Sequence, residues 1–353
     1  MIGIAAPGRY SHHVFSKEIV GEIRSLKPDN WRGSVYLVKD YLAIAAFAYL
    51  SIGVSWWFYP ISVLMIGVHQ RGLSTILHDS AHGVLATNRT LNFLLGTLPT
   101  AWLIFQRHMA YRQSHVLTHH PYLGRADKDP DLEFFIEEGV FVPVTDREYV
   151  TRIVILPAIG SKTWAYMKYL VRNRYQMLMD RLSGRLERDV TKTSDWQYRF
   201  DKWGFASFWC AIVLIGLIYP EFGLTVLLLW GVPYLTSFHT LGWFIELSEH
   251  CSCVEGQSSN VLLARNRRSR NVEKWLTDIN NDSYHLDHHL DPTTPFWRLP
   301  DAHTIRLKDP VYAKHCAESG GLFQRGADGA PSIISILRKQ NADRLGRQSA
   351  AAH

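Results

Sequence analysis

Nine closely spaced histidines are the residues of this sequence best suited to chemistry. His285, His288 and His289 stand at positions i, i+3 and i+4, which would place their imidazoles on one face of a helix. The other six precede them in two clusters and at one single position: His78, His82, His115, His119, His120 and His250. Imidazole nitrogen binds zinc, copper, iron and nickel. The pattern therefore predicts a metal site.

Nine histidines are too many for one zinc ion, which usually takes four ligands. Two metal ions with about four or five ligands each would use them all. Two irons are the economical assignment, because a di-iron centre can activate O2 whereas zinc has no redox chemistry. Oxidation of an unactivated C–H bond is the reaction class that this predicts. A zinc-dependent membrane hydrolase and a metal-binding protein without activity remain as alternatives.

Membrane helices are the elements that must position these histidines. Although the chain of 353 residues has only average hydropathy, its apolar residues are concentrated: residues 41–68 carry no charge, and residues 205–245 carry only Glu221. Each block exceeds the roughly 20 residues of one crossing. Pro60 and Pro220 interrupt the two blocks, so each predicts a helical hairpin. Buried helices of a soluble domain are the disfavoured alternative, because soluble cores rarely exclude Lys and Arg from such long runs.

Basic residues predict the orientation of these hairpins. None of the 38 Lys and Arg residues falls between Lys39 and Arg71 or between Lys202 and Arg265. By the positive-inside rule, both termini and the section between the hairpins lie in the cytoplasm. An even number of crossings then separates the clusters, so all nine histidines are expected on the cytoplasmic side. The apolar segment 91–105 is broken by glycine and proline, and we expect it to be interfacial or re-entrant.

The predicted fold is therefore all-α, with four transmembrane helices in two hairpins and a helical cytoplasmic cap that holds a histidine-rich di-metal site. The predicted divisions are a cytoplasmic N-terminal segment (1–40), a membrane and catalytic domain (41–305, hairpins at about 41–78 and 205–245) and a cytoplasmic C-terminal tail (306–353) with a disordered end (348–353). We expect a multi-pass membrane protein without a cleavable signal peptide. The net charge of +6 is explained by this topology, and no nucleic-acid motif accompanies it.

The chain resembles the membrane fatty acid desaturase family, whose three histidine boxes read HxxxH, HxxHH or HxxxHH, and HxxHH. Here the boxes span residues 78–82, 115–120 and 285–289. Residues 124–131 resemble the acidic DPD segment of the family, and residues 284–300 resemble its YHLEHHLxPxxPxxxLP signature. Glu249 and His250 resemble the extra histidine before the third box. The resemblance extends from about residue 61 to residue 303.

This resemblance implies that the nine histidines bind two irons in an O2-dependent desaturase, which introduces a double bond into the acyl chain of a membrane lipid or fatty acid. A hydroxylase of an acyl lipid or carotenoid is the alternative. The fused cytochrome b5 domain of some members, with its HPGG motif, is not found, so a ferredoxin or a cytochrome b5-like protein would donate electrons. Four arginines could form its docking surface, or could instead hold phospholipid headgroups: Arg265, Arg267, Arg268 and Arg270. The oligomeric state is not predicted.

Acidic residues beside the boxes are the remaining candidates. Glu246 and Asp287 are the candidate catalytic residues, and Glu246 stands one turn before His250, where some desaturases carry an asparagine that reaches the metal through water. Asp79, Asp287 and Glu249 could orient neighbouring imidazoles, or could instead lie on a solvated surface. His239 could line a substrate channel or be a hydrogen-bonded core histidine.

Overall fold

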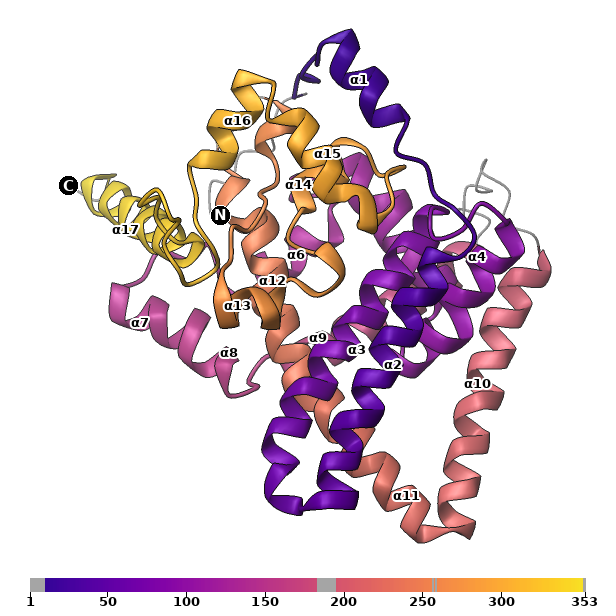
Figure 1. The fold of residues 1–353 in the computed structure, drawn as a ribbon. Helices are drawn as coiled ribbons and strands as arrows, with labels where there is room; N and C mark the ends of the chain where they lie inside the picture. The colour runs from indigo at the N-terminus through magenta and orange to yellow at the C-terminus, as the bar shows by residue number, and fades with distance from the viewer. Residues whose placement is uncertain (1–9, 183–194, 256, 258, 352–353) are drawn as a thin grey trace. The chain divides into compact units, whose positions relative to one another are not determined.

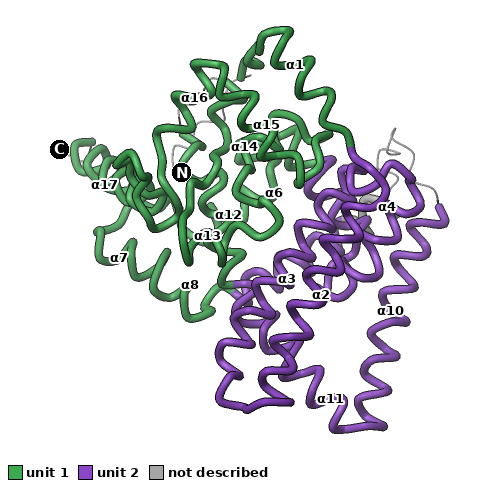
Figure 2. Tube along the Cα trace, viewed as in Figure 1, with its two compact units in different colours: residues 1–27, 118–162, 240–353 green, residues 28–117, 163–239 purple. Residues whose placement is uncertain are grey.

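The structure is a computed structural model, and it describes residues 10–182, 195–255, 257 and 259–351 (Figure 1). Helices account for the regular structure of these residues, whose β contact is limited to an isolated bridge between Ser11 and Ser259. The all-α class is therefore confirmed. The chain divides into two compact units that alternate along the sequence (Figure 2): unit 1 is residues 1–27, 118–162 and 240–353, and unit 2 is residues 28–117 and 163–239.

Unit 2 contains the first predicted hairpin and most of the second, whose last residues continue beyond His239 into α12 of unit 1. In the first, α2 (Arg32–Tyr49) packs along α3 (Tyr59–His82). Pro60 lies in the first turn of α3, where an N–H would have no helical partner. Gly83 ends α3 with φ at 81°, a left-handed conformation that glycine adopts without strain. The second hairpin and the remaining helices of unit 2 are α10 (Asp195–Ile218), α11 (Pro220–Val226), α4 (Arg89–Gly96), α5 (His108–Tyr111) and α9 (Thr163–Leu182).

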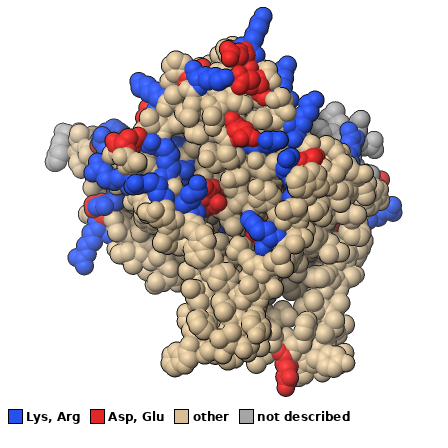
Figure 3. All heavy atoms as spheres, viewed as in Figure 1, with Lys and Arg blue, Asp and Glu red and all other residues tan. Residues whose placement is uncertain are grey.

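Among the described residues, three helical segments are long and apolar enough to cross a membrane: Arg32–Val54, Asp195–Ile218 and Pro220–Cys253. Helix α3 is not one of them, because His69, Gln70 and Arg71 interrupt its apolar sequence. On the face shown in Figure 3, the region where α2 meets α3 and α10 meets α11 is almost free of Lys and Arg. The charge pattern therefore agrees with membrane-embedded hairpin ends.

Unit 1 consists of short helices linked by ordered loops. Val261, Ala264, Leu286, Tyr312 and Cys316 form one of its buried clusters. Helix α1 packs on α15, α14 on α15, and α17 on α7. The helices of unit 1 are α1 (Lys17–Arg24), α6 (Pro130–Glu137), α7 (Asp146–Val150), α8 (Leu156–Ala158), α12 (His239–His250), α13 (Asn271–Thr277), α14 (His285–Leu290), α15 (Leu299–Arg306), α16 (Pro310–Ala317) and α17 (Ile333–Ala351).

The C-terminal section packs against the rest of unit 1 rather than forming an extended tail. Asn341 exchanges two hydrogen bonds with the backbone of Val144, and Arg344 pairs with Glu255 at 3.0 Å. The expected disorder of residues 348–353 is wrong for residues 348–351, which complete α17. Residues 352 and 353 lie outside the described part of the chain.

Candidate metal centre

The third histidine box forms helix α14, as its spacing predicts. Leu286 anchors this helix: its side chain is fully buried, and its backbone N–H donates to Asn266 Oδ1 at 2.9 Å. His285 and His288 are buried as well. The box is therefore held on one side by an apolar core, and its imidazoles are withdrawn from water.

Four imidazoles of unit 1 approach one another through their ring nitrogens. His285 Nε2 lies 2.8 Å from His250 Nε2 and 3.0 Å from His289 Nε2. One ring nitrogen from each of His119, His250 and His289 lies within 4.8 Å of the other two. Unit 1 thus brings together residues from the second box, the third box and the single histidine between them.

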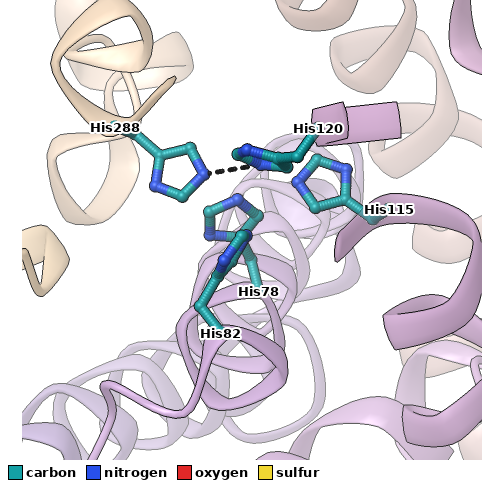
Figure 4. Close-up of side chains that lie close together, drawn as sticks. All are labelled: His78, His82, His115, His120 and His288. Carbon is teal, nitrogen blue, oxygen red and sulfur yellow. Dashed lines mark hydrogen bonds between the residues drawn. The ribbon is translucent and has the colours of Figure 1, made fainter. Parts of the chain in front are cut away.

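His120 and His288 form a second pair in unit 1. Their Nε2 atoms lie 3.1 Å apart, as the dashed line in Figure 4 shows. The ring of His120 also stacks on that of His289, with centroids 4.3 Å apart. Six of the nine predicted metal ligands therefore lie in unit 1.

His119 is oriented by the acidic segment that follows it. Its Nδ1 donates to Asp129 Oδ1 at 2.7 Å, and the same carboxylate accepts the N–H of Gly124 at 2.9 Å and caps the N-terminus of α6. Pro130 supplies the first helical residue. Burial lowers the pKa of His119, but the carboxylates of Asp129 and Asp131 outweigh it and raise the pKa to about 9. The DPD segment therefore holds this imidazole in place.

Acceptors behind the rings also fix His250 and His285. His250 Nδ1 lies 3.1 Å from the carbonyl oxygen of Leu263, and His285 Nδ1 lies 3.5 Å from Glu249 Oε2. An acceptor at Nδ1 requires a proton there, so each neutral ring keeps its lone pair at Nε2. Two such lone pairs at 2.8 Å repel unless a proton or a metal cation lies between them. This donor set fits a metal ion that prefers imidazole, iron included.

Arg267 fixes the carboxylate of Glu249 in turn. The Arg267 side chain is fully buried, and its Nη1 donates to Glu249 Oε1 at 2.7 Å. Its Nη2 donates to the carbonyl oxygen of Thr277 at 2.9 Å and to Asp282 at 3.2 Å. Glu249 is itself 5% exposed, so a solvated surface position is wrong for it. A buried ion pair thus stands directly behind His285.

Asp287 is anchored away from the box histidines. It is fully buried, and it accepts from Arg306 Nη1 at 2.6 Å, Tyr312 Oη at 2.6 Å and Asn266 Nδ2 at 2.7 Å. Burial raises the pKa of Asp287, but hydrogen bonding to His303 and the charge of Arg306 outweigh it, so the net pKa is lowered. A solvated position is therefore wrong for Asp287 too, and its contacts suit the anchoring of α14.

The arginine-rich segment is only partly exposed: Arg265 and Arg267 are buried, Arg268 is half-buried and Arg270 is exposed. Arg265 and Arg267 are only 7% and 3% exposed, which rules out a docking or headgroup-binding role for both. Arg268 pairs with Asp328 at 2.7 Å, and Arg270 donates to the carbonyl oxygen of Arg325 at 3.0 Å. These arginines bind within unit 1, because the loop between α16 and α17 supplies acceptors that the local sequence does not reveal.

The three remaining box histidines lie in unit 2. His78 and His82 stand at the end of α3, and His115 belongs to a π-helical segment, Arg112–His119 (Figure 4). The ring centroids of His78 and His82, and those of His78 and His115, lie 4.8 Å apart. Tyr111 stacks on His115 at 5.1 Å. The second cluster is thus a compact group of three imidazoles.

Box one has a carboxylate of its own. Asp79 is 1% exposed, and its Oδ1 lies 3.3 Å from His78 Nδ1, so the solvated alternative is wrong here as well.

Glu246 is half-buried on α12, one turn before His250. Sequence reasoning did not assign a role to Asp129 and did not connect Arg267 with the metal site. For Asp129, a signal was present in the Asp-Pro pair of a helix N-terminus.

Comparison with known proteins identifies relatives of this chain. Residues 54–319 match the fatty acid desaturase family. A dihydrorhizobitoxine desaturase from Bradyrhizobium elkanii is 46% identical over 97% of this chain and 94% of that protein. An acyl-lipid omega-3 desaturase (cytochrome b5) of the endoplasmic reticulum from Arabidopsis thaliana is 26% identical over 80% of this chain and 74% of that protein. A chloroplastic sn-2 acyl-lipid omega-3 desaturase (ferredoxin) from Helianthus annuus is 24% identical over 82% of this chain and 64% of that protein. The family match includes all nine histidines.

Proposed function

We propose, from the premise that this chain belongs to the fatty acid desaturase family, that it removes two hydrogens from adjacent carbons of its substrate with O2 as co-substrate. The chain is an oxidoreductase of that family. The observation that best supports the metal chemistry is the convergence of Nε2 atoms in unit 1, with the outer nitrogens of three rings held by protein acceptors. Such a donor set is suited to binding metal and has no other evident use.

We assign all nine histidines as ligands of two irons, six from unit 1 and three from unit 2. Support comes from box two, which contributes to both clusters: the boundary between the units falls between Leu117 and Thr118. Only three residues separate His115 from His119, and one π-helical segment contains both. One short stretch of the chain therefore contributes to both clusters.

The bound irons would supply the activation of O2 and the oxidation of a C–H bond. The protein's own residues hold the imidazoles in the orientation that metal binding requires. Asp129, Glu249 and the carbonyl of Leu263 keep the Nδ1 protons in place, so that the Nε2 lone pairs face inward. Arg267 holds the carboxyl group of Glu249 in place beside His285. We also propose that Glu246, one turn before His250, contributes to the metal site.

In the membrane, we propose four crossings in two hairpins, with the termini and both histidine clusters on the cytoplasmic side. Three segments of sufficient length and apolarity support this, as does the absence of Lys and Arg from both hairpins beyond Arg71 of α3. Helix α3 would be the fourth crossing, since it runs antiparallel to α2 and returns the chain to His78. Its polar residues would face protein rather than lipid.

Two substrates are supported by different observations. An acyl chain fits a membrane enzyme and the names of the plant relatives. Dihydrorhizobitoxine is favoured by the 46% identity over nearly the whole of both chains, against 24–26% for the plant relatives. We therefore rank dihydrorhizobitoxine, or a compound close to it, above an acyl lipid. The electron donor is proposed to be a separate ferredoxin or cytochrome b5-like protein.

The test is product analysis with membranes containing the wild-type chain, O2 and a reductase system, given dihydrorhizobitoxine in one arm and acyl lipid in the other. We expect a product two hydrogens lighter than its precursor, absent in His288→Ala and present in the control His12→Ala, whose histidine is exposed. A product heavier by one oxygen would move the assignment to hydroxylase. One zinc and no iron in the purified protein would overturn both oxidative assignments.

A further inference from the structure

A second group of polar side chains in unit 2 lies outside the histidine boxes. Arg174 projects from α9, Tyr234 begins a π-helical segment (Tyr234–Phe238), and His239 follows it. Arg107 is the residue before α5. None of these four residues is assigned to the metal site, and none belongs to a motif of the sequence.

Aromatic rings bring this group together. The Tyr234 ring lies 4.7 Å from that of His239 and 5.0 Å from that of Phe105. The ring of Tyr166 also stacks on that of His239, with centroids 5.3 Å apart. The Arg174 guanidinium lies 5.0 Å above the ring of Phe205. The polar tips of the group are thus surrounded by apolar walls and shielded from water.

Several of these tips have no hydrogen-bond partner among the residues that the structure describes. They are buried atoms: Nε and Nη2 of Arg174, Nη2 of Arg107, the hydroxyl of Tyr234 and Nε2 of His239. Tyr234 is 1% exposed and His239 is 3% exposed. A hydrogen-bonded core position, one of the two interpretations of His239, is therefore wrong within the described part of the chain.

The carboxylate of Asp201, which lies against these arginines, is already engaged. Its Oδ2 lies 3.4 Å from Arg107 Nε, but Asp201 also accepts hydrogen bonds from Trp102 Nε1 and the backbone N–H groups of His108 and Met109, each at 3.1 Å. Arg174 lies over Phe205, which stands one helical turn after Asp201 on α10, and α5 packs against both α9 and α10, so the two arginines approach the same part of unit 2. Among the described residues, Asp201 thus divides its charge among four donors, and Arg174 has no ion pair.

A buried guanidinium without an anion costs several kcal/mol, roughly, and proteins normally avoid this. An arginine pair with a hydroxyl beside it is the arrangement that recognises carboxylate and phosphate, because guanidinium donates in a planar fork. We propose that Arg174, Arg107, Tyr234 and His239 form a binding site for an oxyanion, a carboxylate or a phosphate, carried by the substrate.

The assignment of this oxyanion to the substrate rests on the proposed desaturase function; the site itself does not. Arg107 precedes His115 by eight residues, and α5 and the start of the π-helical segment connect them within unit 2. An anion held at Arg107 and Arg174 would fix one end of the substrate relative to the histidines of that unit. Such anchoring would decide which carbons are presented for oxidation.

The experiment is a binding measurement on the full-length protein in phosphatidylcholine nanodiscs, without iron or O2. The probes are laurate, lauryl alcohol, inorganic phosphate and nanodiscs that contain phosphatidylglycerol. We expect laurate, but not the alcohol, to raise the melting temperature of the wild type. Arg174→Gln should weaken laurate binding by at least about 10-fold, the loss of a charged hydrogen bond. Tyr234→Phe should weaken it by less, and the exposed α9 control Lys168→Gln should leave it unchanged.

Stability without ligand separates binding from a structural role. Because Nε and Nη2 of Arg174 lack a partner among the described residues, Arg174→Gln should leave the ligand-free melting temperature unchanged or raise it, and Arg174→Lys should restore part of the laurate affinity. Stabilisation by phosphatidylglycerol alone would assign the oxyanion to a lipid headgroup; stabilisation by laurate or phosphate in phosphatidylcholine would assign it to a free ligand. Equal laurate affinity in wild type and Arg174→Gln, or a lower ligand-free melting temperature in the variant, would overturn the site. Failure of binding here would leave the desaturation assay unaffected, since that assay measures product.

Discussion

The two histidine clusters differ in how the protein holds them. In unit 1, His119, His250 and His285 each have an acceptor behind the ring, supplied by a loop, a carbonyl and a buried ion pair from separate parts of the chain. In unit 2, His78 has the adjacent Asp79, and His115 has the stacked ring of Tyr111. One cluster is fixed by long-range contacts, and the other by its own helices.

From this difference we predict which variants should impair the protein most. Long-range anchors hold a geometry only while all their members are present, because each buried charge depends on its partner. Local anchors should tolerate more substitutions, since the helix backbone already sets the direction of each imidazole. We therefore expect the unit 1 cluster to be the more sensitive of the two to changes outside the histidines themselves.

The largest effect is expected from the ligands of unit 1. His285→Ala removes an imidazole that contacts both His250 and His289, so activity should fall below detection and iron should drop from about two per chain to one or none. Metal analysis and product assay check this. His12→Ala is the control, because His12 is exposed and lies outside the boxes. Full iron content in His285→Ala would remove it from the ligand set.

The next largest effect is expected for Arg267→Leu, which should lower the stability of the folded protein. It leaves Glu249 buried without its cation, which costs about 3–5 kcal/mol. The melting temperature should fall by many degrees, whereas Arg268→Leu, at a partly exposed pair, should change it little. The double variant with Arg267→Leu and Glu249→Gln should recover part of the lost melting temperature. Equal melting temperatures for the two single variants would contradict the proposed difference between buried and exposed pairs.

Asp129→Asn and Asp79→Asn compare the anchors of the two clusters directly. Loss of the 2.7 Å contact to His119 should weaken iron binding by about 10- to 100-fold, the usual effect of removing an outer hydrogen-bond partner. The 3.3 Å contact to His78 should matter less. Iron affinity under anaerobic conditions, measured by competition with a chelator, checks this. The reverse order of effects would show that local anchors are the stronger ones.

The pH dependence of iron binding should report His119. Its pKa of about 9 means that the metal-free ring carries two protons at neutral pH, and one of them must leave before Nε2 can bind metal. Affinity should therefore rise by about tenfold from pH 7 to pH 8 and level off above pH 9. Asp129→Asn removes the carboxylate charge that raises the pKa of His119, so the pH dependence of iron affinity should shift to lower pH. A flat profile in the wild type would exclude proton release from His119.

The smallest effect is expected at Tyr111. Tyr111→Phe keeps the ring that stacks on His115, so activity should stay close to wild type. Tyr111→Leu removes the stacking and should reduce activity by about 3- to 10-fold, in line with an aromatic pair worth roughly 0.5–1.5 kcal/mol. Turnover assays on both variants check this. A large loss in Tyr111→Phe would instead assign a role to the hydroxyl.

Features that depend on local periodicity were predictable from the sequence. The helix of box three and the hairpin turns at Pro60 and Pro220 follow from spacing and proline position, and the structure contains all three. Periodicity also explains the orientation of Asp287, a candidate catalytic residue by sequence. Asp287 stands two residues after His285, about 200° around the helix, and so faces away from the metal ligands.

Long-range contacts were not predictable. Arg267 and Glu249 are 18 residues apart in sequence, and a run of arginines in sequence resembles a surface patch. Arg174 and Tyr234 are likewise 60 residues apart, and neither has a local signal. Packing in the folded chain determines which groups surround such residues, whereas a single sequence reveals only the charge of each residue.

The interleaved order of the two units has a consequence for how the protein is made. His119 is synthesised early, but His285 and His289, which complete its cluster, follow more than 160 residues later. At a synthesis rate of about 5–20 residues per second, that delay is roughly 10–30 s. The first hairpin is synthesised before that interval and the second during it, so both can enter the bilayer while the early histidines are still without their partners. Iron loading of the proposed site in unit 1 would therefore be a late event of biogenesis that follows membrane insertion and cannot guide it.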